Sequence, residues 1–217
     1  ELAETIIHRF DERLNMKPYL MDGAHITPND IAFTLMGPSR SILMVERLVL
    51  NFMQRMSGIA TLTHRYVQAV EGTGCRVLDT RKTTPTLRAL EKWAVRLGGG
   101  TNHRHGLYDM IMLKDNHIDY CGGITAAVER AYRYVQTTKP GLKIEVETRS
   151  LADVEEVLRV GHTDRIMLDN FQPEQITEAL RLIQGRVETE ASGGINLNNL
   201  EAYAATGVDF ISSGAVI

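Results

Sequence analysis

The chain has 217 residues, of which 43% are hydrophobic and 24% are charged, and its formal net charge is −3. This composition is that of a globular protein with one full core and part of a second. No apolar run approaches the roughly 18 residues of a membrane span, and the acidic balance argues against a nucleic-acid partner. The two distant cysteines indicate neither a disulfide framework nor a zinc site, so we expect a cytoplasmic protein.

The first 45 residues predict part of a small α+β domain. Apolar residues at helical spacing (Leu2, Ile6, Phe10) precede a turn at Gly23 and a strand-like run, IAFTLMG, at 31–37. A long helical pattern then runs from Ser41 to Val70, and Ser57-Gly58 predict a break within it. We therefore expect residues 46–74 to form linking helices.

From Cys75 onward, short apolar runs alternate with segments of helical period. The runs predict six strands, at 75–80, 110–114, 143–148, 165–170, 187–192 and 209–214. Ser150 and Asn196 are predicted to begin helices, and Gly161 and Gly185 to end them. This alternation predicts a parallel α/β sheet over residues 75–217, either open or closed as a barrel.

Each of the six predicted strands ends in polar or glycine residues. These are Thr80, Arg81, Lys82, Lys114, Glu147, Asp169, Ser192, Gly193, Gly194, Ser213 and Gly214. In parallel α/β folds the C-terminal ends of the strands share one edge, and that edge binds ligands. The Ser/Gly pairs after the last two strands expose backbone N–H groups of the kind that binds phosphate.

The segment from Arg76 to His117 is a cationic island in an acidic chain. It holds eight Lys/Arg against four Asp/Glu, so the remainder of the chain carries a net −7. Such an island indicates a small anionic ligand rather than a nucleic-acid backbone. Taken singly, its cations also fit solvated loops, and Glu147 and Asp169 fit salt bridges as well as metal binding. His103, His105 and His117 are possible zinc ligands by type, but Arg104 beside them fits phosphate or carboxylate better.

Longer motifs resemble those of the quinolinate phosphoribosyltransferase family, also called nicotinate-nucleotide pyrophosphorylase (carboxylating). They are ERLVLNFMQRMSGIAT (46–61), DTRKTTPTLR (79–88), GGGTNHRHGLYD (98–109), LKDNH (113–117), EVET (145–148), LDNF (168–171) and EASGGI (190–195). The resemblance implies a pentosyltransferase of NAD biosynthesis. With magnesium, it would join quinolinate to phosphoribosyl pyrophosphate, giving nicotinate mononucleotide, pyrophosphate and carbon dioxide. It also implies a homodimer in which an incomplete, seven-stranded α/β barrel packs on an N-terminal α+β open-faced sandwich domain, here present in part.

The resemblance further implies a role for each matching residue. Arg47 is similar to an arginine that reaches into the active site of the partner subunit, and Lys82 to a lysine near phosphoribosyl pyrophosphate. Glu147 and Asp169 resemble carboxylates that face the ribose hydroxyls and magnesium, and with Lys82 and Lys114 they form the implied catalytic group. The implied quinolinate-facing residues are Thr80, Arg81, His103, Arg104 and Lys114. The implied 5′-phosphate cradle is Ser192, Gly193, Gly194, Ser213 and Gly214.

The chain departs from the family pattern in two respects. Thr86 stands where a glycine usually follows the proline, which predicts a slight shift of that loop. Family members also extend further at both ends, so we expect the chain to be part of a longer protein.

Two other hypotheses remain open from the sequence. One is a paralogue that uses the same phosphoribosyl donor with another acceptor base, such as nicotinate. The other is a non-catalytic anion-binding barrel. The presence of both Glu147 and Asp169 argues against the latter, because an anion sensor gains nothing from these carboxylates.

Overall fold

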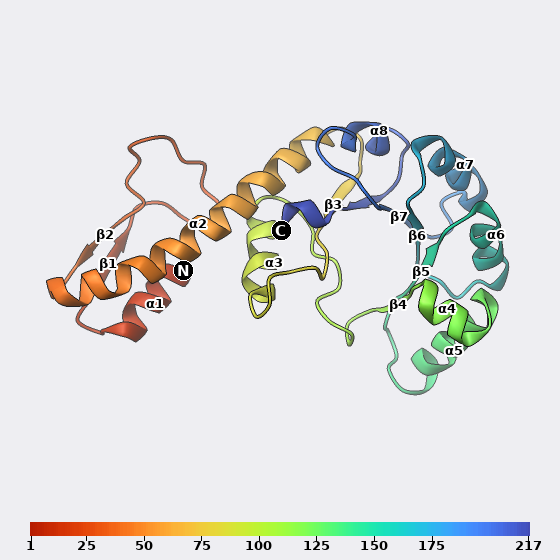
Figure 1. The fold of residues 1–217 in the computed structure, drawn as a ribbon, viewed down its shortest axis with the longest axis horizontal. Helices are drawn as coiled ribbons and strands as arrows, with labels where there is room; N and C mark the ends of the chain where they lie inside the picture. Colours follow the sequence, from red (N-terminus) through yellow and green to blue (C-terminus); the bar gives the residue numbers. More distant parts are fainter.

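The computed structural model describes residues 1–217, in which one long helix joins a small N-terminal part to a larger α/β part (Figure 1). The N-terminal part contains helix α1 (Leu2–Phe10) and strands β1 (Asn15–Pro18) and β2 (Phe33–Met36), which pair antiparallel. Its small core consists of Ile7, Leu14, Val45 and Val49. The predicted helix and the strand within 31–37 are confirmed, whereas β1 carries too few apolar residues for the sequence to reveal it.

Helix α2 (Ser39–Ala69) is continuous over 31 residues, so the break predicted at Ser57-Gly58 is wrong. A glycine inside a helix costs only about 1 kcal/mol relative to alanine, which packing along the rest of the helix offsets. The N-terminal half of α2 packs into the small core through Val45 and Val49, and its C-terminal half packs into the main core through Ile59 and Tyr66. One helix therefore contributes to both cores.

Six parallel strands form the second sheet, in the order β3-β8-β7-β6-β5-β4. The strands are β3 (Arg76–Leu78), β4 (Ile111–Leu113), β5 (Ile144–Thr148), β6 (Arg165–Asp169), β7 (Glu188–Ser192) and β8 (Phe210–Ser212). The sheet curves as in a barrel (Figure 1). Its edge strands β3 and β4 do not pair with each other, so the barrel is incomplete. The predicted α/β class and all six predicted strands are confirmed.

Helices cover the outer side of this sheet (Figure 1). They are α3 (Arg88–Leu97), α4 (Asp115–Cys121), α5 (Ile124–Thr137), α6 (Leu151–Val160), α7 (Pro173–Ile183) and α8 (Leu200–Ala204), and a 3₁₀ helix η1 (Gly214–Val216) follows β8. Helix α4 was not predicted: it begins directly after Lys114, whose backbone N–H donates to His117 Nδ1 at 3.0 Å. None of the helices combines the length and the apolar character that a membrane crossing requires.

The predicted helix boundaries are correct where local hydrogen bonding decides them. The Ser150 hydroxyl accepts the Asp153 N–H at 3.2 Å and starts α6, which ends at Gly161 with φ +72°. The Asn196 prediction is wrong, because α8 begins only after Asn199. The Asn196 side chain instead accepts the Asn198 N–H at 3.0 Å in a turn, a common alternative for asparagine. Helix α7 ends at Ile183, and its C-cap is Gln184, one residue before the predicted Gly185.

Strand alternation gives the barrel an apolar outer face and a charged interior. Successive side chains of a strand point to opposite faces. In β5, Ile144 and Val146 belong to the main core beneath the helices, which leaves Glu145 and Glu147 on the inner face. The same alternation puts Arg165 and Asp169 of β6, and Glu188, Glu190 and Ser192 of β7, on the inner face. This interior supports the site described next.

Candidate active site

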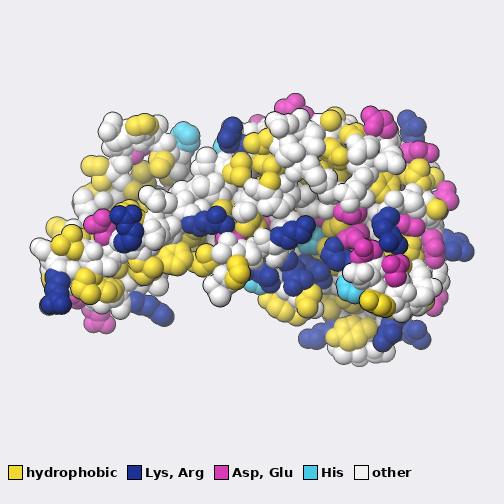
Figure 2. All heavy atoms as spheres, in the orientation of Figure 1, with side chains coloured by type: hydrophobic (Ala, Val, Ile, Leu, Met, Phe, Trp, Pro, Cys, Tyr) yellow, Lys and Arg dark blue, Asp and Glu magenta, His cyan; other side chains and the backbone are white.

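The strand ends bring most of the predicted site residues to one edge of the barrel. Asp169 lies beside Ser192 in the register of β6 and β7, and Leu78 lies beside Ser212 in that of β3 and β8. The residues that follow these pairs in sequence therefore leave the sheet at the same edge. Figure 2 shows Lys and Arg side chains gathered over the middle of the barrel, next to a group of Asp and Glu side chains.

Arg81 and Arg104 place two guanidinium groups near each other in this site. Arg104 is 9% exposed, and its Nη1 donates to the Met110 carbonyl at 3.3 Å. The Nε atoms of both arginines are buried without a hydrogen-bond partner in the protein. Burial lowers the pKa of Arg104, and the charge of Arg81 lowers it further. Two repelling cations with unused buried donors favour the binding of an anion with more than one carboxylate or phosphate oxygen.

Lys114, Glu147 and Asp169 form a second group at the same edge. The Lys114 ammonium donates to Glu147 Oε2 at 2.5 Å, and Glu147 is buried whereas Lys114 is about half-exposed. Burial raises the pKa of Asp169, and the charge of Glu147 raises it further. The two carboxylates are therefore near enough to repel each other, with one ammonium group between them to offset part of that repulsion.

The two glycine-containing loops, 192–194 at the end of β7 and 213–214 after β8, differ in which residues they expose to solvent. Gly193 has φ +101°, and a Cβ there would lie 2.2 Å from Asn170 Oδ1, so only glycine fits. A Cβ on Gly214 would lie 3.9 Å from both Lys82 Cδ and Thr80 Oγ1, so this loop lies beside Thr80 and Lys82. Ser213 is buried, and its hydroxyl donates to the Ile195 carbonyl at 2.8 Å. The solvent-facing parts of the loops are therefore Gly194 and Gly214.

A buried ion pair that the sequence did not reveal anchors the cationic loop. Asp79 and Lys92 are both buried, and the Lys92 ammonium donates to Asp79 Oδ1 and to the His103 carbonyl, the latter at 2.9 Å. Asp79 also accepts from Asn102 Nδ2 at 2.5 Å and from the His103 N–H at 2.8 Å. Burial raises the pKa of Asp79 and lowers that of Lys92, so each charge depends on the other. Nothing in the sequence pointed to this pair, because a lysine on a helix is usually solvated.

A second anchor holds the loop that follows Lys82. Arg55 of α2 donates to Glu91 Oε1 at 2.6 Å and to the Thr84 hydroxyl at 3.1 Å, and the Thr84 N–H donates to Glu91 Oε2 at 2.9 Å. Thr86 has φ +68°, a left-handed conformation that is rare for a β-branched residue. The departure noted in the sequence thus coincides with local backbone strain, and the neighbouring anchor holds the loop in place.

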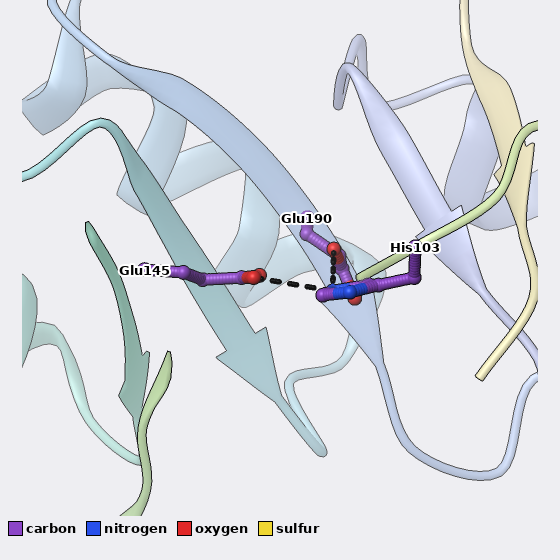
Figure 3. Close-up of side chains that lie close together, drawn as sticks. All are labelled: His103, Glu145 and Glu190. Carbon is purple, nitrogen blue, oxygen red and sulfur yellow. Dashed lines mark ion pairs between the residues drawn. The ribbon is translucent and has the colours of Figure 1, made fainter. Parts of the chain in front are cut away.

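His103 points into the barrel interior (Figure 3). Its Nε2 lies 3.1 Å from Glu145 and 3.2 Å from Glu190, and its Nδ1 accepts the Arg104 N–H at 2.7 Å. Burial lowers the pKa of His103, whereas contact with Glu145 and Glu190 raises it above its usual value. Because Nδ1 accepts the Arg104 N–H, the ring proton of this arrangement lies on Nε2, facing the two carboxylates. Burial and the charge of Glu190 raise the pKa of Glu145 to about 7. These partners lie far from His103 in sequence, so local spacing gave no sign of them.

Arg47 does not join this cluster within one chain. It is exposed on the N-terminal half of α2, the half that packs into the small core. At 1.5 Å per helical residue, it lies roughly 18 Å along the helix from Ile59, where α2 enters the main core. Its predicted role therefore depends on a second subunit.

Nearly the whole chain is similar to proteins of one family. The family model for the C-terminal domain of quinolinate phosphoribosyl transferase matches residues 59–217, and the model for the N-terminal domain matches residues 1–57. A relative from Nicotiana tabacum, quinolinate phosphoribosyltransferase (decarboxylating) 1b, is 44% identical. A relative from Arabidopsis thaliana, nicotinate-nucleotide pyrophosphorylase (carboxylating), chloroplastic, is 42% identical. Each alignment covers 99% of this chain, which spans 65% of the length of each relative.

A solved structure shows the same fold. The nicotinate-nucleotide pyrophosphorylase from Francisella tularensis superposes with a TM-score of 0.93 at 40% sequence identity. The superposition covers 99% of this chain and 75% of the Francisella chain.

Proposed function

This chain belongs to the quinolinate phosphoribosyltransferase family, and from that premise we propose that the protein transfers phosphoribose from phosphoribosyl pyrophosphate to quinolinate. Decarboxylation would follow and yield nicotinate mononucleotide, pyrophosphate and carbon dioxide. The observation that carries the proposal is the pair of arginines, Arg81 and Arg104, whose buried Nε–H groups lack partners. Quinolinate has two adjacent carboxylates, and guanidinium groups bind carboxylates through paired hydrogen bonds.

The donor side of the proposed site lies where the two loop systems meet. Lys82 and Thr80 lie beside Gly214, and the Ser192-Gly193-Gly194 turn leaves the neighbouring strand. We assign Lys82 to the diphosphate, and Ser192, Gly193, Gly194, Ser213 and Gly214 to the 5′-phosphate. Negative charge builds on the departing diphosphate in the transition state, and a fixed ammonium group stabilises that charge.

Magnesium fits the carboxylates at this edge. Mg²⁺ is commonly held by one or two carboxylates together with substrate phosphates and water. Glu147 and Asp169 supply two carboxylates, and burial together with the charge of Glu147 raises the pKa of Asp169. A bound magnesium ion would neutralise charge on the diphosphate. The same carboxylates would stabilise the cation-like ribosyl centre that develops while the bond to the ring nitrogen forms.

The remaining steps require no nucleophilic side chain. Arg81, Arg104 and Lys114 would orient quinolinate so that its ring nitrogen faces the ribose carbon. Once the nitrogen is quaternised, the electron pair of the neighbouring carbon–carboxylate bond can stay on the ring carbon as carbon dioxide leaves, and that carbon then takes up a proton from water. Lys114 is paired with Glu147, so it connects the residues assigned to quinolinate with the carboxylates assigned to the ribose and magnesium.

The nicotinate hypothesis fits this geometry less well. Nicotinate has one carboxylate, so part of the cationic cluster would stay unpaired, at a cost of several kcal/mol for an uncompensated buried charge. The anion-sensor hypothesis leaves Lys114, Glu147 and Asp169 without a purpose. A thermal-shift screen with quinolinate, nicotinate and phosphoribosyl pyrophosphate, with and without magnesium, separates the three hypotheses.

The reaction itself is the decisive test. With the full-length protein, we expect carbon dioxide and pyrophosphate in equal amounts from quinolinate, phosphoribosyl pyrophosphate and magnesium. Nicotinate should be a far poorer acceptor because it leaves guanidinium groups unpaired. The measurement is release of ¹⁴CO₂ from labelled quinolinate alongside a pyrophosphate assay. Efficient turnover of nicotinate, or pyrophosphate without carbon dioxide, would overturn the proposal.

Arg104→Ala should weaken quinolinate binding by about 10- to 150-fold, corresponding to about 1.5–3 kcal/mol for a charge-assisted contact. Isothermal titration calorimetry with quinolinate measures this directly. The matched control is Arg133→Ala, because Arg133 is exposed on α5, outside the barrel mouth. Unchanged affinity in Arg104→Ala, with the control also unchanged, would remove Arg104 from the acceptor site.

The homodimer and the location of the protein are also proposals. We propose that Arg47 completes the acceptor site of the partner subunit, because in its own chain it lies on the distant half of α2. The Arabidopsis relative is named as chloroplastic, so the cytoplasmic location of this protein stays a prediction. The domain boundaries at residues 45 and 74 likewise stay predictions.

A further inference from the structure

Charged side chains, most of them buried, form a connected chain of charges in the barrel interior, next to the proposed acceptor site. Glu190 on β7 is fully buried, and its Oε2 accepts from Arg165 Nη1 at 3.1 Å. The same oxygen lies 3.2 Å from His103 Nε2 (Figure 3). Arg165 also donates to Glu188 at 3.0 Å, and Glu188 pairs with the exposed Lys143 at 3.3 Å. Glu190 is thus the one carboxylate of this chain that contacts both Arg165 and His103.

His103 connects this chain of charges to the anion-binding loop. Its Nε2 faces the carboxylates of Glu190 and Glu145, and its Nδ1 accepts the backbone N–H of Arg104 at 2.7 Å. The position of the ring therefore fixes the backbone at Arg104, whose guanidinium group has few other contacts. The only hydrogen bond from that group goes to the Met110 carbonyl, at 3.3 Å. A shift of the imidazole ring would move the start of the Arg104 side chain directly.

His103, Glu145 and Glu190 could hold a metal ion by residue type, since their ligand atoms lie within 4.8 Å of one another. Arg165 argues against that use. Its guanidinium group already occupies one Glu190 oxygen and lowers the need for a further cation. A metal ion bound there would also lie close to the positive charge of Arg165, which repels it.

We propose that Glu190 is a positioning residue for the acceptor site, which it serves by holding the His103 ring and, through that ring, Arg104. The expected effect on quinolinate affinity rests on the proposed function. The orientation of the His103 ring by Glu190 does not depend on that function. For histidines that bind metal ions, losing the partner that orients the ring costs about 10- to 100-fold in affinity or activity, and we expect a loss at the lower end here. Glu145 supports the ring from β5, whereas Glu190 also connects it to Arg165.

The chain offers a matched control two residues away. Glu188 lies on the same strand and also pairs with Arg165, but it does not contact His103. Glu190→Gln keeps the shape of the side chain but removes its negative charge, which weakens its attraction for both the Arg165 guanidinium and the His103 Nε2–H. We expect Glu190→Gln to weaken quinolinate binding about tenfold, with phosphoribosyl pyrophosphate affinity within about twofold of the parent. Glu188→Gln should leave both affinities within about twofold of the parent values, because it only weakens a partly exposed ion pair.

A spectroscopic measurement tests the cause separately. In ¹⁵N-histidine-labelled protein, the His103 ring signals, assigned with His103→Gln, should shift in Glu190→Gln and stay unchanged in Glu188→Gln. If Glu190→Gln does not fold, Glu190→Asp retains the charge on a shorter side chain. It should show the same shift and weaker quinolinate binding.

The outcomes distinguish a failure of the proposed function from a failure of the role assigned to Glu190. If the parent protein does not bind quinolinate, the proposed function fails and the His103 signals alone decide the inference. Unchanged His103 signals in Glu190→Gln overturn it in either case. If the parent protein binds quinolinate, a shift of the His103 signals in Glu190→Gln without a loss of quinolinate affinity also overturns the inference. Equal losses of affinity in Glu188→Gln and Glu190→Gln would show a general effect on stability, and they also overturn it.

Discussion

Lys92→Met should destabilise the fold by about 3–5 kcal/mol, because it removes the cation that neutralises the buried Asp79 carboxylate. For a chain of this size, that loss lowers the melting temperature by roughly 6–20 °C. Urea unfolding followed by circular dichroism measures it. The same change should loosen the Asn102–Arg104 loop, because Lys92 also donates to the His103 carbonyl. Activity should therefore fall even at temperatures where the variant stays folded.

Two controls identify the cause of this loss. Lys143→Met removes an ion pair whose lysine is 53% exposed, and it should cost no more than about 1 kcal/mol. Lys92→Met combined with Asp79→Asn removes both charges and should recover part of the stability. Burial raises the pKa of Asp79, and losing Lys92 raises it further, so protonation favours the folded variant. The deficit should then shrink as the pH falls, and a Lys92→Met protein within 1 kcal/mol of the parent contradicts the account.

Mixing two inactive variants should restore activity if the active site is shared between subunits. Arg47→Ala and Lys114→Ala should each abolish most activity when present alone. In a hybrid dimer, the barrel of the Arg47→Ala subunit receives an intact arginine from its partner. Half of the dimers in an equal mixture are hybrids and each has one intact site, so about a quarter of the parent activity should return.

The control for subunit mixing uses two residues of the same barrel. Arg81→Ala mixed with Lys114→Ala should give no recovery, because both changes fall in the site of their own chain and every hybrid site carries one of them. Mass spectrometry of differently labelled subunits establishes that exchange has taken place. If exchanged dimers of Arg47→Ala and Lys114→Ala stay inactive, Arg47 does not act across the interface.

The sequence determined the features that depend on local pattern. Short β-rich runs such as RIMLD, separated by segments of helical period, were sufficient to predict all six parallel strands and the shared edge at their C-terminal ends. The Ser150 cap and the Gly161 stop were equally visible, because the capping side chain and the positive φ are properties of single residues. Family motifs then assigned roles that no spacing rule could supply.

The tertiary structure decided where charges meet inside the barrel. His103, Glu145 and Glu190 lie on separate elements, and only the curvature of the sheet brings Glu145 and Glu190 to within 3.1 and 3.2 Å of the same ring nitrogen. Burial then fixes their protonation, because desolvation acts on the folded arrangement and not on the sequence. The Asp79–Lys92 pair follows the same rule: a lysine on a helix face reads as solvated until a buried carboxylate lies opposite it. Helix α2 stayed unbroken at Gly58 because its two halves pack into separate cores, a stabilisation that helix propensity does not contain.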